Sequence, residues 1–452
     1  MRSGFAGVAI ALVTSAAVAA ACSSSTDETT GKLTTAQLQD PGTCQSCHAD
    51  QFREWSGSMH AYASEDPVFL AMNKRMLRET NGASADFCVN CHAPLAVKLG
   101  LTKDGSNLAE VPAAMRGVTC YFCHSVDAVN GTHDNPLHLA TDGVMRGGIA
   151  DPSKLMPHGG MHSDLHDREV HDSATTCGAC HDVMTPHGAN VERTFDEWKA
   201  SLYAKPGQLT CGKCHMPGRD GQAAQIAGAP TNRRVHDHGM AGVDIALTSF
   251  FGADTQRAAV QSLLDSTVLV KLCVQQTPLG ITATVNIDNA FAGHSFPSGA
   301  NQDRRAWVEL GAFKAGASIL SSGAIQDGKA ATAFTDPNLW LLRDKIFRED
   351  GTETHLFWEA ARVEPSQLPP SVTNDPLDPA FIHSVTHTYP LPAVPDRVTT
   401  RVRMRPVDFD LLDDLVTSGD LDPAIPAKVP TYDLASGTKE WDFATTGFGC
   451  VN

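Results

Sequence analysis

The feature that most constrains the fold of this chain is a pentapeptide pattern, C-x-x-C-H, which occurs five times between residues 44 and 215. The copies read CQSCH, CVNCH, CYFCH, CGACH and CGKCH. Random placement of 13 cysteines and 19 histidines over 452 positions would give roughly 0.02 such pentapeptides, so the repetition is not an accident of composition. The cysteine pairs are Cys44 and Cys47, Cys88 and Cys91, Cys120 and Cys123, Cys177 and Cys180, and Cys211 and Cys214, and the histidines that follow are His48, His92, His124, His181 and His215.

The spacing of this pattern fits the covalent attachment of a c-type haem. Cysteines three positions apart project from one face of a helical turn, where they can bond to two carbons on one edge of a porphyrin. The next residue, a histidine, is then held under the ring and can bind the iron axially. The sequence therefore predicts five covalent c-type haems, with the five motif histidines as proximal iron ligands.

Two other uses of paired cysteines explain the pattern less well. A structural zinc site needs two C-x-x-C units that close one tetrahedron, and five separate C-x-x-C-H units do not divide into such sites. Disulfides suit an exported chain, but they give no reason for a histidine after every pair. Five macrocycles within so short a segment would themselves form the core, so we expect short helices and loops packed around them.

The length and charge of the chain limit the number of domains and the class of partner that can be expected. At 452 residues the chain is long enough for two folded domains. Its formal net charge of −16 is spread along the sequence. This charge argues against nucleic acids or anionic membrane surfaces as partners, and it favours basic proteins.

The first 22 residues are predicted to be an export signal, because an early arginine is followed by an alanine-rich apolar stretch. Two processing routes remain open. Three alanines before Cys22 and the polar run after it are typical of a lipoprotein signal, in which Cys22 carries the lipid. Ordinary signal cleavage is the alternative, since the position three before Cys22 holds Ala19 and not a bulky residue. Both routes place the mature protein in the periplasm or, as a lipoprotein, on the outer membrane, with a lipid on Cys22 as its one predicted membrane attachment.

The chain is predicted to be of the α+β class, with an N-terminal multihaem domain and a C-terminal antiparallel β-sandwich. Helices are expected in the first domain over 49–63, 66–80 and 193–204, whereas 125–172 and 218–232 are expected to be mostly loop. The predicted segments are an export signal (1–22), a flexible Ser/Thr-rich tether (23–42), a pentahaem domain (43–240) and a β-rich domain (241–452).

The sandwich is predicted from short β-branched runs that are separated by Gly, Pro and Asn. These runs are VLVKLCVQQ, GITATVNIDN, RAWVELGAF, HSVTHTYPL and VTTRVRMRP. Helices are expected over 254–266 and 409–419. Cys273 and Cys450 belong to no motif, and they form either a disulfide that ties the tail to the sandwich or two buried thiols.

The sixth position of each iron decides the chemistry, because a second histidine gives an electron carrier and an open position gives a site for substrate. His60 follows the first motif on a predicted helix and is a candidate distal ligand. Further candidates form three groups. A cluster before the fourth motif contains His158, His162, His166 and His171, and a pair after the fifth motif contains His236 and His238. The weaker candidates are His133, His138 and His187. His355, His383 and His387 lie in the predicted sandwich and are expected to be structural.

His294 stands out because it lies far beyond the last motif, in AFAGHSFPSG. Taken alone it would be a histidine in a turn. The glycines around it would allow a close approach to a porphyrin, and Pro297 would stiffen the turn. We therefore expect His294 to reach back from the second domain and cap a haem of the first.

Several stretches resemble the multihaem cytochromes of the cytochrome c-552/4 class. They are CQSCHADQFREWSGSMHAYA, GVTCYFCHSV, CGACHDVMTPHGANVERTFDEWKAS, TCGKCHMPG, RRVHDHGMAGVD and AFAGHSFPSG. The resemblance implies bis-histidine haems packed closely enough to pass electrons along a chain. Carried over position by position, it implies distal ligands at His60, His162 or a near neighbour, His238 and His294. It offers no clear fifth ligand, so one haem is either open or served by His133, His138 or His187.

Three functions are consistent with these observations. The first is an exported electron carrier that exchanges electrons with redox partner proteins. The second is a reductase of a small nitrogen compound at one open haem, although the sequence has no C-x-x-C-K motif of the kind that pentahaem nitrite reductases carry. The third is a structural module of an extracellular electron-transfer complex, for which no motif in the sequence is specific.

Overall fold

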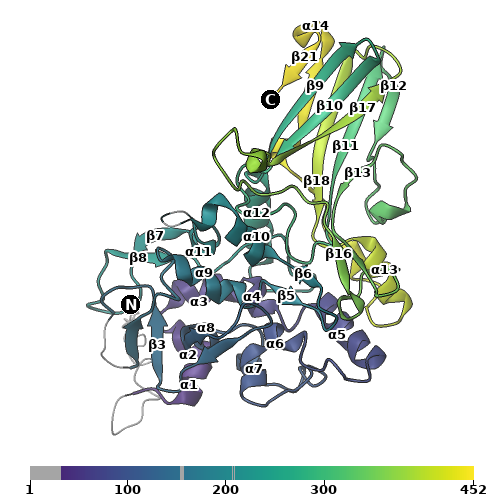
Figure 1. Cartoon of the computed structure of the whole chain (residues 1–452). Helices are drawn as coiled ribbons and strands as arrows, with labels where there is room; N and C mark the ends of the chain where they lie inside the picture. Colours follow the sequence, from purple (N-terminus) through teal and green to yellow (C-terminus); the bar gives the residue numbers. More distant parts are fainter. Residues whose placement is uncertain (1–31, 153–156, 206, 208) are drawn as a thin grey trace, which may run out of the picture.

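A computed structural model describes residues 32–152, 157–205, 207 and 209–452. The predicted export signal and Cys22 lie outside the described residues. Within the described part, no helix combines the length and the apolar character needed to cross a membrane. The protein is of the α+β class, with short helices in its N-terminal region and antiparallel sheets in its C-terminal region (Figure 1).

The N-terminal region, up to residue 240, consists of short elements joined by loops. Its longest helix is α5 (Pro67–Glu79). The other α-helices are α1 (Thr35–Gln39), α2 (Pro41–Gln45), α3 (Ala49–Ser56), α4 (Met59–Tyr62), α6 (Val89–His92), α7 (Pro94–Lys98), α8 (Cys120–His124), α9 (Ala174–Gly178), α10 (Thr194–Ala200) and α11 (Cys211–His215). The strands are β1 (Val126–Val129), β2 (Leu137–Leu139), β3 (Val144–Gly147), β4 (Gly159–His162), β5 (Val183–Met184), β6 (Asn190–Glu192), β7 (Gly218–Gly221) and β8 (Arg233–His236).

The predicted helices of this region are confirmed, with two differences. The helix expected over 193–204 ends at Ala200 as α10 and is followed, after Ser201, by a 3-10 turn at Leu202–Ala204. The helix expected over 49–63 is divided into α3 and α4 at Gly57. Ser58 begins the second helix, because its hydroxyl accepts a hydrogen bond from the backbone N–H of Ala61 at 3.3 Å. The break turns α4 and His60 away from the axis of α3.

Three predictions of irregular structure need correction. The predicted tether over 23–42 contains α1 within its described part, because Thr34 forms a capping box with Gln37 and Leu38 is buried. Leu38 packs with Leu95 and Phe122. The segment 125–172 also contains four short strands, which pair as β1 with β2 and, in parallel, β3 with β4. The loop expected over 218–232 begins with β7, which pairs with β8.

The C-terminal region forms the predicted antiparallel sandwich. One sheet has the order β17-β10-β9-β21, and the other has the order β12-β11-β18-β19 with β13 and β20 attached. Every run predicted to be a strand forms one, and the helices expected over 254–266 and 409–419 are α12 and α13. The elements are α12 (Ala253–Asp265), β9 (Leu269–Thr277), β10 (Gly280–Asp288), β11 (Arg305–Lys314), β12 (Ala317–Ser322), β13 (Trp340–Leu342), β14 (Lys345–Phe347), β15 (Glu353–Thr354), β16 (Arg362–Glu364), β17 (Ser384–Leu391), β18 (Arg397–Arg405), α13 (Phe409–Thr417), β19 (Tyr432–Asp433), β20 (Lys439–Asp442), α14 (Phe443–Thr446) and β21 (Gly449–Val451). Single turns of 3-10 helix are η1 (Ala113–Met115), η2 (His171–Ser173), η3 (Leu202–Ala204), η4 (Ala331–Ala333), η5 (Phe357–Glu359), η6 (Pro379–Phe381), η7 (Pro426–Lys428) and η8 (Ala435–Gly437).

Cys273 and Cys450 form a disulfide. Cys450 lies on β21, which pairs with β9 so that the two cysteines are direct cross-strand partners. Of the two alternatives left open by the sequence, the structure therefore has the disulfide, which fixes the C-terminal strand to the sandwich.

The two regions share one hydrophobic core. Alternate side chains of β9, β10, β11 and β18 point between the sheets, and this core continues to Met72 and Met76 on α5. Ion pairs extend the contact, since Arg78 on α5 binds Asp420, just after α13. The sandwich is thus packed directly on the part of the chain that carries the motifs (Figure 1).

Candidate haem sites

Each C-x-x-C-H motif forms a single helical turn. In the first motif the N–H of His48 donates to the carbonyl of Cys44 at 2.8 Å, and in the fourth the N–H of His181 donates to the carbonyl of Cys177 at 3.0 Å. These bonds place the first cysteine and the histidine on one face of the turn. All ten motif cysteines are free thiols, so they are available for thioether bonds to a porphyrin.

Contacts between cysteines show which motifs are neighbours. The thiols of Cys44 and Cys120 lie close together, which places the first motif beside the third. Cys180 lies beside Cys91, which places the fourth motif next to the second. Cys177 lies beside Cys211, which places the fourth motif next to the fifth. Cys123 lies near Cys177, which joins the third motif to the fourth. The five motifs are therefore contiguous, with the fourth at the branch point.

Four motif histidines face a second histidine at nearly the same distance. The ring centroids are 6.1 Å apart for His48 and His158, 6.2 Å for His181 and His60, 6.3 Å for His124 and His238, and 6.5 Å for His215 and His294. A metal–nitrogen bond of about 2 Å on each side, plus about 1.1 Å from each nitrogen to its ring centroid, separates two trans imidazoles by about 6.2 Å. The four pairs thus have the spacing at which one iron atom would bind both rings.

The second nitrogen of most of these rings is already engaged. Metal-bound histidines usually donate their other N–H to a carbonyl or carboxylate, which fixes the ring and leaves the facing nitrogen for the metal. Among the proximal histidines, Nδ1 contacts a backbone carbonyl in His48 (Ala223, 2.6 Å), His92 (Ala63, 3.0 Å), His124 (Arg146, 2.5 Å) and His215 (Ala241, 2.8 Å). Among the facing histidines it does so in His238 (His236, 2.8 Å) and His294 (Ser295, 2.8 Å). The residues present therefore fit bis-histidine haem binding.

Burial keeps these rings neutral at pH 7, which is the form that binds iron. Desolvation lowers the pKa of His60, His124 and His294 to about 4 and that of His181 to about 3. The ring of His181 nevertheless keeps exposed surface.

His60 is held in place by the segment that precedes the third motif. The N–H of Val118 donates to the carbonyl of His60 at 2.8 Å. Gly117 has φ +66°, and a Cβ at this position would lie 2.6 Å from the same carbonyl oxygen. This close approach therefore requires a glycine at position 117.

The Nδ1 partner of His60 is unusual, because it is the thioether sulfur of Met240 at 3.0 Å. Met240 has φ +45°, a left-handed conformation that is uncommon for a residue other than glycine. A thioether is a weaker acceptor than the carbonyls that contact the other rings. The sequence alone does not identify Met240, since its role depends on the fold around His60.

His294 lies in the loop between β10 and β11. Glu197 on α10 accepts hydrogen bonds from the backbone N–H of Ser295 at 3.2 Å and from the hydroxyl of Ser298 at 2.6 Å. Asn289 donates to the carbonyl of His294 at 2.7 Å. The loop is thus tied to the N-terminal region, and it brings His294 opposite His215.

Of His162 and its near neighbours, His158 is the histidine that faces His48, the histidine of the first motif. The Nε2 of His162 contacts the carboxylate of Asp167 at 3.1 Å. The sequence could not separate these two, because both lie in one histidine-rich loop without a distinguishing neighbour. His166 also lies near His124, with ring centroids 5.8 Å apart, but its two nitrogens contact Ser163 and the carbonyl of Cys123.

His92 differs from the other proximal histidines. Its ring stacks on Phe69 with centroids 4.2 Å apart, and no second histidine forms a ring pair with it among the described residues. The weaker candidates lie elsewhere, since His138 pairs with Asp127, His187 pairs with Glu349 and His133 contacts Thr132. Sequence reasoning left the fifth distal ligand unassigned, and this geometry associates that gap with the second motif.

The three other histidines of the C-terminal region have structural contacts. His355 pairs with Asp414 and His383 with Asp288, while His387 packs against Trp340 and Tyr389. These contacts agree with the structural roles expected for the three residues.

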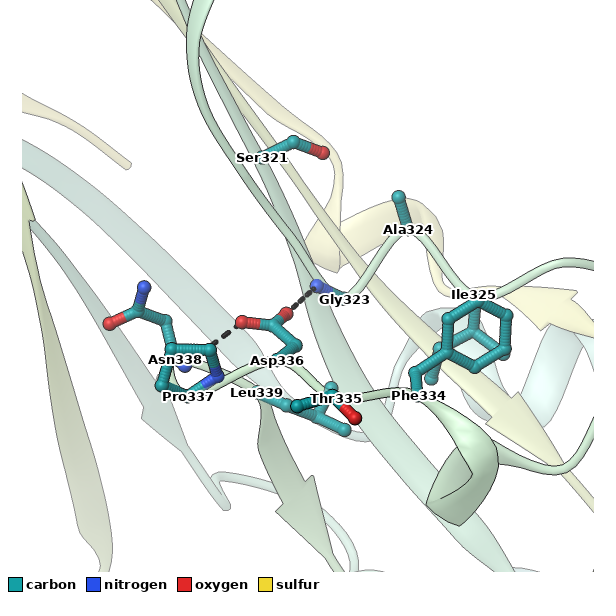
Figure 2. Close-up of a pocket in the computed structure, with 10 residues that line it drawn as sticks. All are labelled: Ser321, Gly323, Ala324, Ile325, Phe334, Thr335, Asp336, Pro337, Asn338 and Leu339. Atoms are coloured by element: carbon teal, nitrogen blue, oxygen red, sulfur yellow. Dashed lines mark hydrogen bonds between the residues drawn. The ribbon is translucent and has the colours of Figure 1, made fainter.

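A separate cavity of about 300 Å³ lies in the sandwich, between the end of β12 and the start of β13 (Figure 2). Asp336 points into it, but its carboxylate accepts hydrogen bonds from the N–H groups of Gly323 and Asn338. No histidine or cysteine is among the residues that line the cavity. It is therefore separate from the haem sites.

Comparison with protein families supports the assignment of the motifs. Residues 43–125 match the family described as cytochrome c554 and c-prime. The matched segment contains the first three motifs. This match, together with the five motifs, supports the prediction of a multihaem c-type cytochrome. No curated protein sequence matches it closely enough to be counted as a relative.

A solved structure shares the fold of this chain over most of its length. It is the penta-heme cytochrome c552 from Thermochromatium tepidum, which aligns with a TM-score of 0.61 and 20% sequence identity. The alignment covers 90% of the present chain and 98% of the other. The combination of a motif-bearing region with an antiparallel sandwich is therefore a fold that the two chains share.

Proposed function

We propose that the protein is an exported pentahaem cytochrome that transfers electrons between redox partner proteins. The four histidine pairs with centroids 6.1 to 6.5 Å apart carry this proposal. When bound, each haem would supply a one-electron couple, and the chain would set its potential through ligands, burial and nearby hydrogen bonds. Two histidines on one iron leave no position for substrate, which favours transfer over catalysis.

In this proposal the haems of four motifs each have one proximal and one distal histidine. His158, and not His162, would serve with His48, while His60, His238 and His294 would serve with His181, His124 and His215. The ten motif cysteines would hold the porphyrins covalently. The neighbouring thiols support an electron path from the first motif through the third to the fourth, with branches to the second and fifth.

The cellular site and domain roles belong to the same proposal. The export signal over residues 1–22 would direct the chain to the periplasm or to the outer membrane, with a lipid on Cys22 as the alternative to simple cleavage. Mass spectrometry of the mature N-terminus distinguishes the two. The domain division near residue 240 would separate the motif-bearing part from a sandwich that contributes one ligand, His294.

Haem counting and spin counting test the proposed function. A pyridine haemochrome assay should give five haems per chain. Electron paramagnetic resonance of the oxidised protein should then show four low-spin irons and one high-spin iron. A count other than five, or a majority of high-spin irons, would contradict the assignment.

The geometry of His92 supports a second candidate function, a reductase of a small nitrogen compound at the haem of the second motif. The ring of His92 stacks on Phe69, and no histidine faces it among the described residues. Carbon monoxide added to the reduced protein should bind at about one haem in five if that iron has an open position. Absence of any ligand uptake would exclude this second function and leave electron transfer intact.

A further inference from the structure

An exposed apolar patch lies at the end of the sandwich that adjoins the fifth motif. Its members are Leu269 (52% exposed), Phe291 (61%), Leu377 (90%), Phe381 (37%) and Ile382 (70%). Large apolar side chains that gather on a surface usually mark an interaction site, whereas single ones need no explanation.

Hydrogen bonds between the segments place Leu269, Phe291 and Ile382 at one end of the same sheet. Leu269 is the cross-strand partner of Asp288 at one end of the β9–β10 ladder. The N–H of Phe291 donates to the carbonyl of Thr267 at 3.2 Å, and the N–H of Asn289 donates to the carbonyl of His383 at 3.1 Å. Phe291 and Ile382 therefore flank the end of the same sheet.

The patch adjoins the proposed haem of the fifth motif. Phe291 precedes His294 by three residues, which span at most about 10 Å of chain. The hydroxyl of Tyr203 donates to the carbonyl of Ala290 at 2.8 Å, and Tyr203 also lies near Cys214. Cys214 is the one motif cysteine that is exposed. A haem held by this motif would consequently lie near the protein surface.

Two of the segments that form the patch carry no positive charge, although Lys271 lies two residues from Leu269 on the exposed face of β9. The segments 272–303 and 365–396 contain no lysine or arginine. Asp375 and Asp378 lie beside Leu377, and both are exposed. Their carboxylates accept hydrogen bonds from the N–H groups of Leu377 and Ala380. The net charge of the whole chain, −16, has the same sign.

We propose that this patch is the docking surface for a basic electron-transfer protein, which exchanges electrons with the haem of the fifth motif. The proposal rests on the proposed electron-transfer function. A partner with an apolar centre and a rim of lysines would complement both features, since apolar cores with polar rims are typical of transient interfaces. Opposite charges would also speed the encounter.

Stopped-flow kinetics test this proposal. The reduced protein is mixed with an oxidised, lysine-rich c-type cytochrome as the probe, and the second-order rate constant is measured at several salt concentrations. We expect F291S/I382S to lower this constant about fivefold and D375K/D378K to lower it about tenfold at low salt. In D375K/D378K the increase in rate at low salt should become weaker.

Matched variants control for nonspecific effects. Leu279 is 99% exposed at the opposite end of the β9–β10 hairpin, so L279S should leave the rate unchanged. Asp350 and Asp422 are exposed and accept hydrogen bonds from N–H groups in the same way as Asp375 and Asp378, so D350K/D422K measures the effect of the changed net charge alone. Equal rates for the patch variants and these controls would overturn the proposal.

Two further measurements distinguish docking at the patch from inactive haems and from self-association. Oxidation by ferricyanide reports whether the haems themselves work, and failure of the unmutated protein in that reaction would refute the electron-transfer function. Sedimentation of the unmutated protein and of F291S/I382S reports the oligomeric state. A dimer that dissociates in the variant would show that the patch binds a second copy, and it would refute docking of a basic partner.

Discussion

The rings of His215 and His294 face each other with centroids 6.5 Å apart and planes 12° from parallel. His215 ends the fifth motif, and His294 lies in the loop that precedes β11 of the sandwich. The sandwich therefore does more than cover the motif-bearing region, because it supplies one side of a proposed haem site.

Replacing His294 by alanine should convert one low-spin haem to high-spin. The iron would lose one of its two axial ligands while its thioether bonds and His215 remain. Electron paramagnetic resonance of the oxidised variant should show one more high-spin iron than the unmutated protein, and added imidazole should reverse the change. H387A, which alters a histidine inside the sandwich, serves as the control. A spectrum of H294A identical to that of the unmutated protein would refute the assignment.

His158 and His162 allow a direct comparison within one loop. H158A should create one high-spin iron, because His158 faces His48 at 6.1 Å. H162A should leave all spin states unchanged, because the Nε2 of His162 contacts Asp167. Optical and paramagnetic resonance spectra of the two variants show which of the two histidines binds an iron. The reverse pattern would restore the ligand assignment made from the sequence.

Much of this arrangement could be predicted from sequence because it depends on local spacing. The motif cysteines and proximal histidines follow from a five-residue pattern, and the strands follow from β-branched runs between turn residues. His294 could be predicted by resemblance and by the glycines around it. The disulfide of Cys273 and Cys450 remained one of two alternatives, since pairing depends on the register of β21 with β9.

The rest could not be predicted because it depends on contacts between distant segments. His158 and His162 have similar neighbours in sequence, and the fold alone brings one of them to His48. α1 was missed because its stability comes from a capping box at Thr34 and from burial of Leu38, which a Ser/Thr-rich composition conceals. Met240 could not be linked to His60 without the three-dimensional structure.

Met240 should influence the potential of the haem that His60 and His181 are proposed to bind. A stronger acceptor at Nδ1 makes an imidazole more electron-rich, which stabilises the oxidised iron. M240Q would offer an amide oxygen in place of the thioether, so one midpoint potential should fall by roughly 60 mV, which is tenfold in a one-electron equilibrium. Spectroelectrochemical titration measures this shift. M161Q, at an exposed methionine, is the control, and unchanged potentials in M240Q would show that the contact has no influence.

The junction between α5 and the end of α13 should make stability depend on pH. The carboxylate of Asp420 is 1% exposed and binds Arg78 through two hydrogen bonds of 2.6 and 2.7 Å, with Lys74 at 3.3 Å. The Arg78 guanidinium, together with Ser418 and Lys74, holds the pKa of Asp420 well below its ordinary value. A carboxyl group whose pKa is lowered by folding stabilises the protein above its unfolded pKa of about 3.9, and this contribution is lost as the pH falls below that value.

D420N should therefore reduce the free energy of unfolding by about 2 kcal/mol at pH 7, because it leaves Arg78 without its charged partner. The difference between D420N and the unmutated protein should shrink as the pH is lowered from about 5 toward about 2.5, since protonation removes the same interaction. Thermal unfolding followed by circular dichroism across this range measures both effects. D422N, at an exposed aspartate two residues away, should behave like the unmutated protein. A difference that persists at the lowest pH would mean that Asp420 acts through packing and not through its charge.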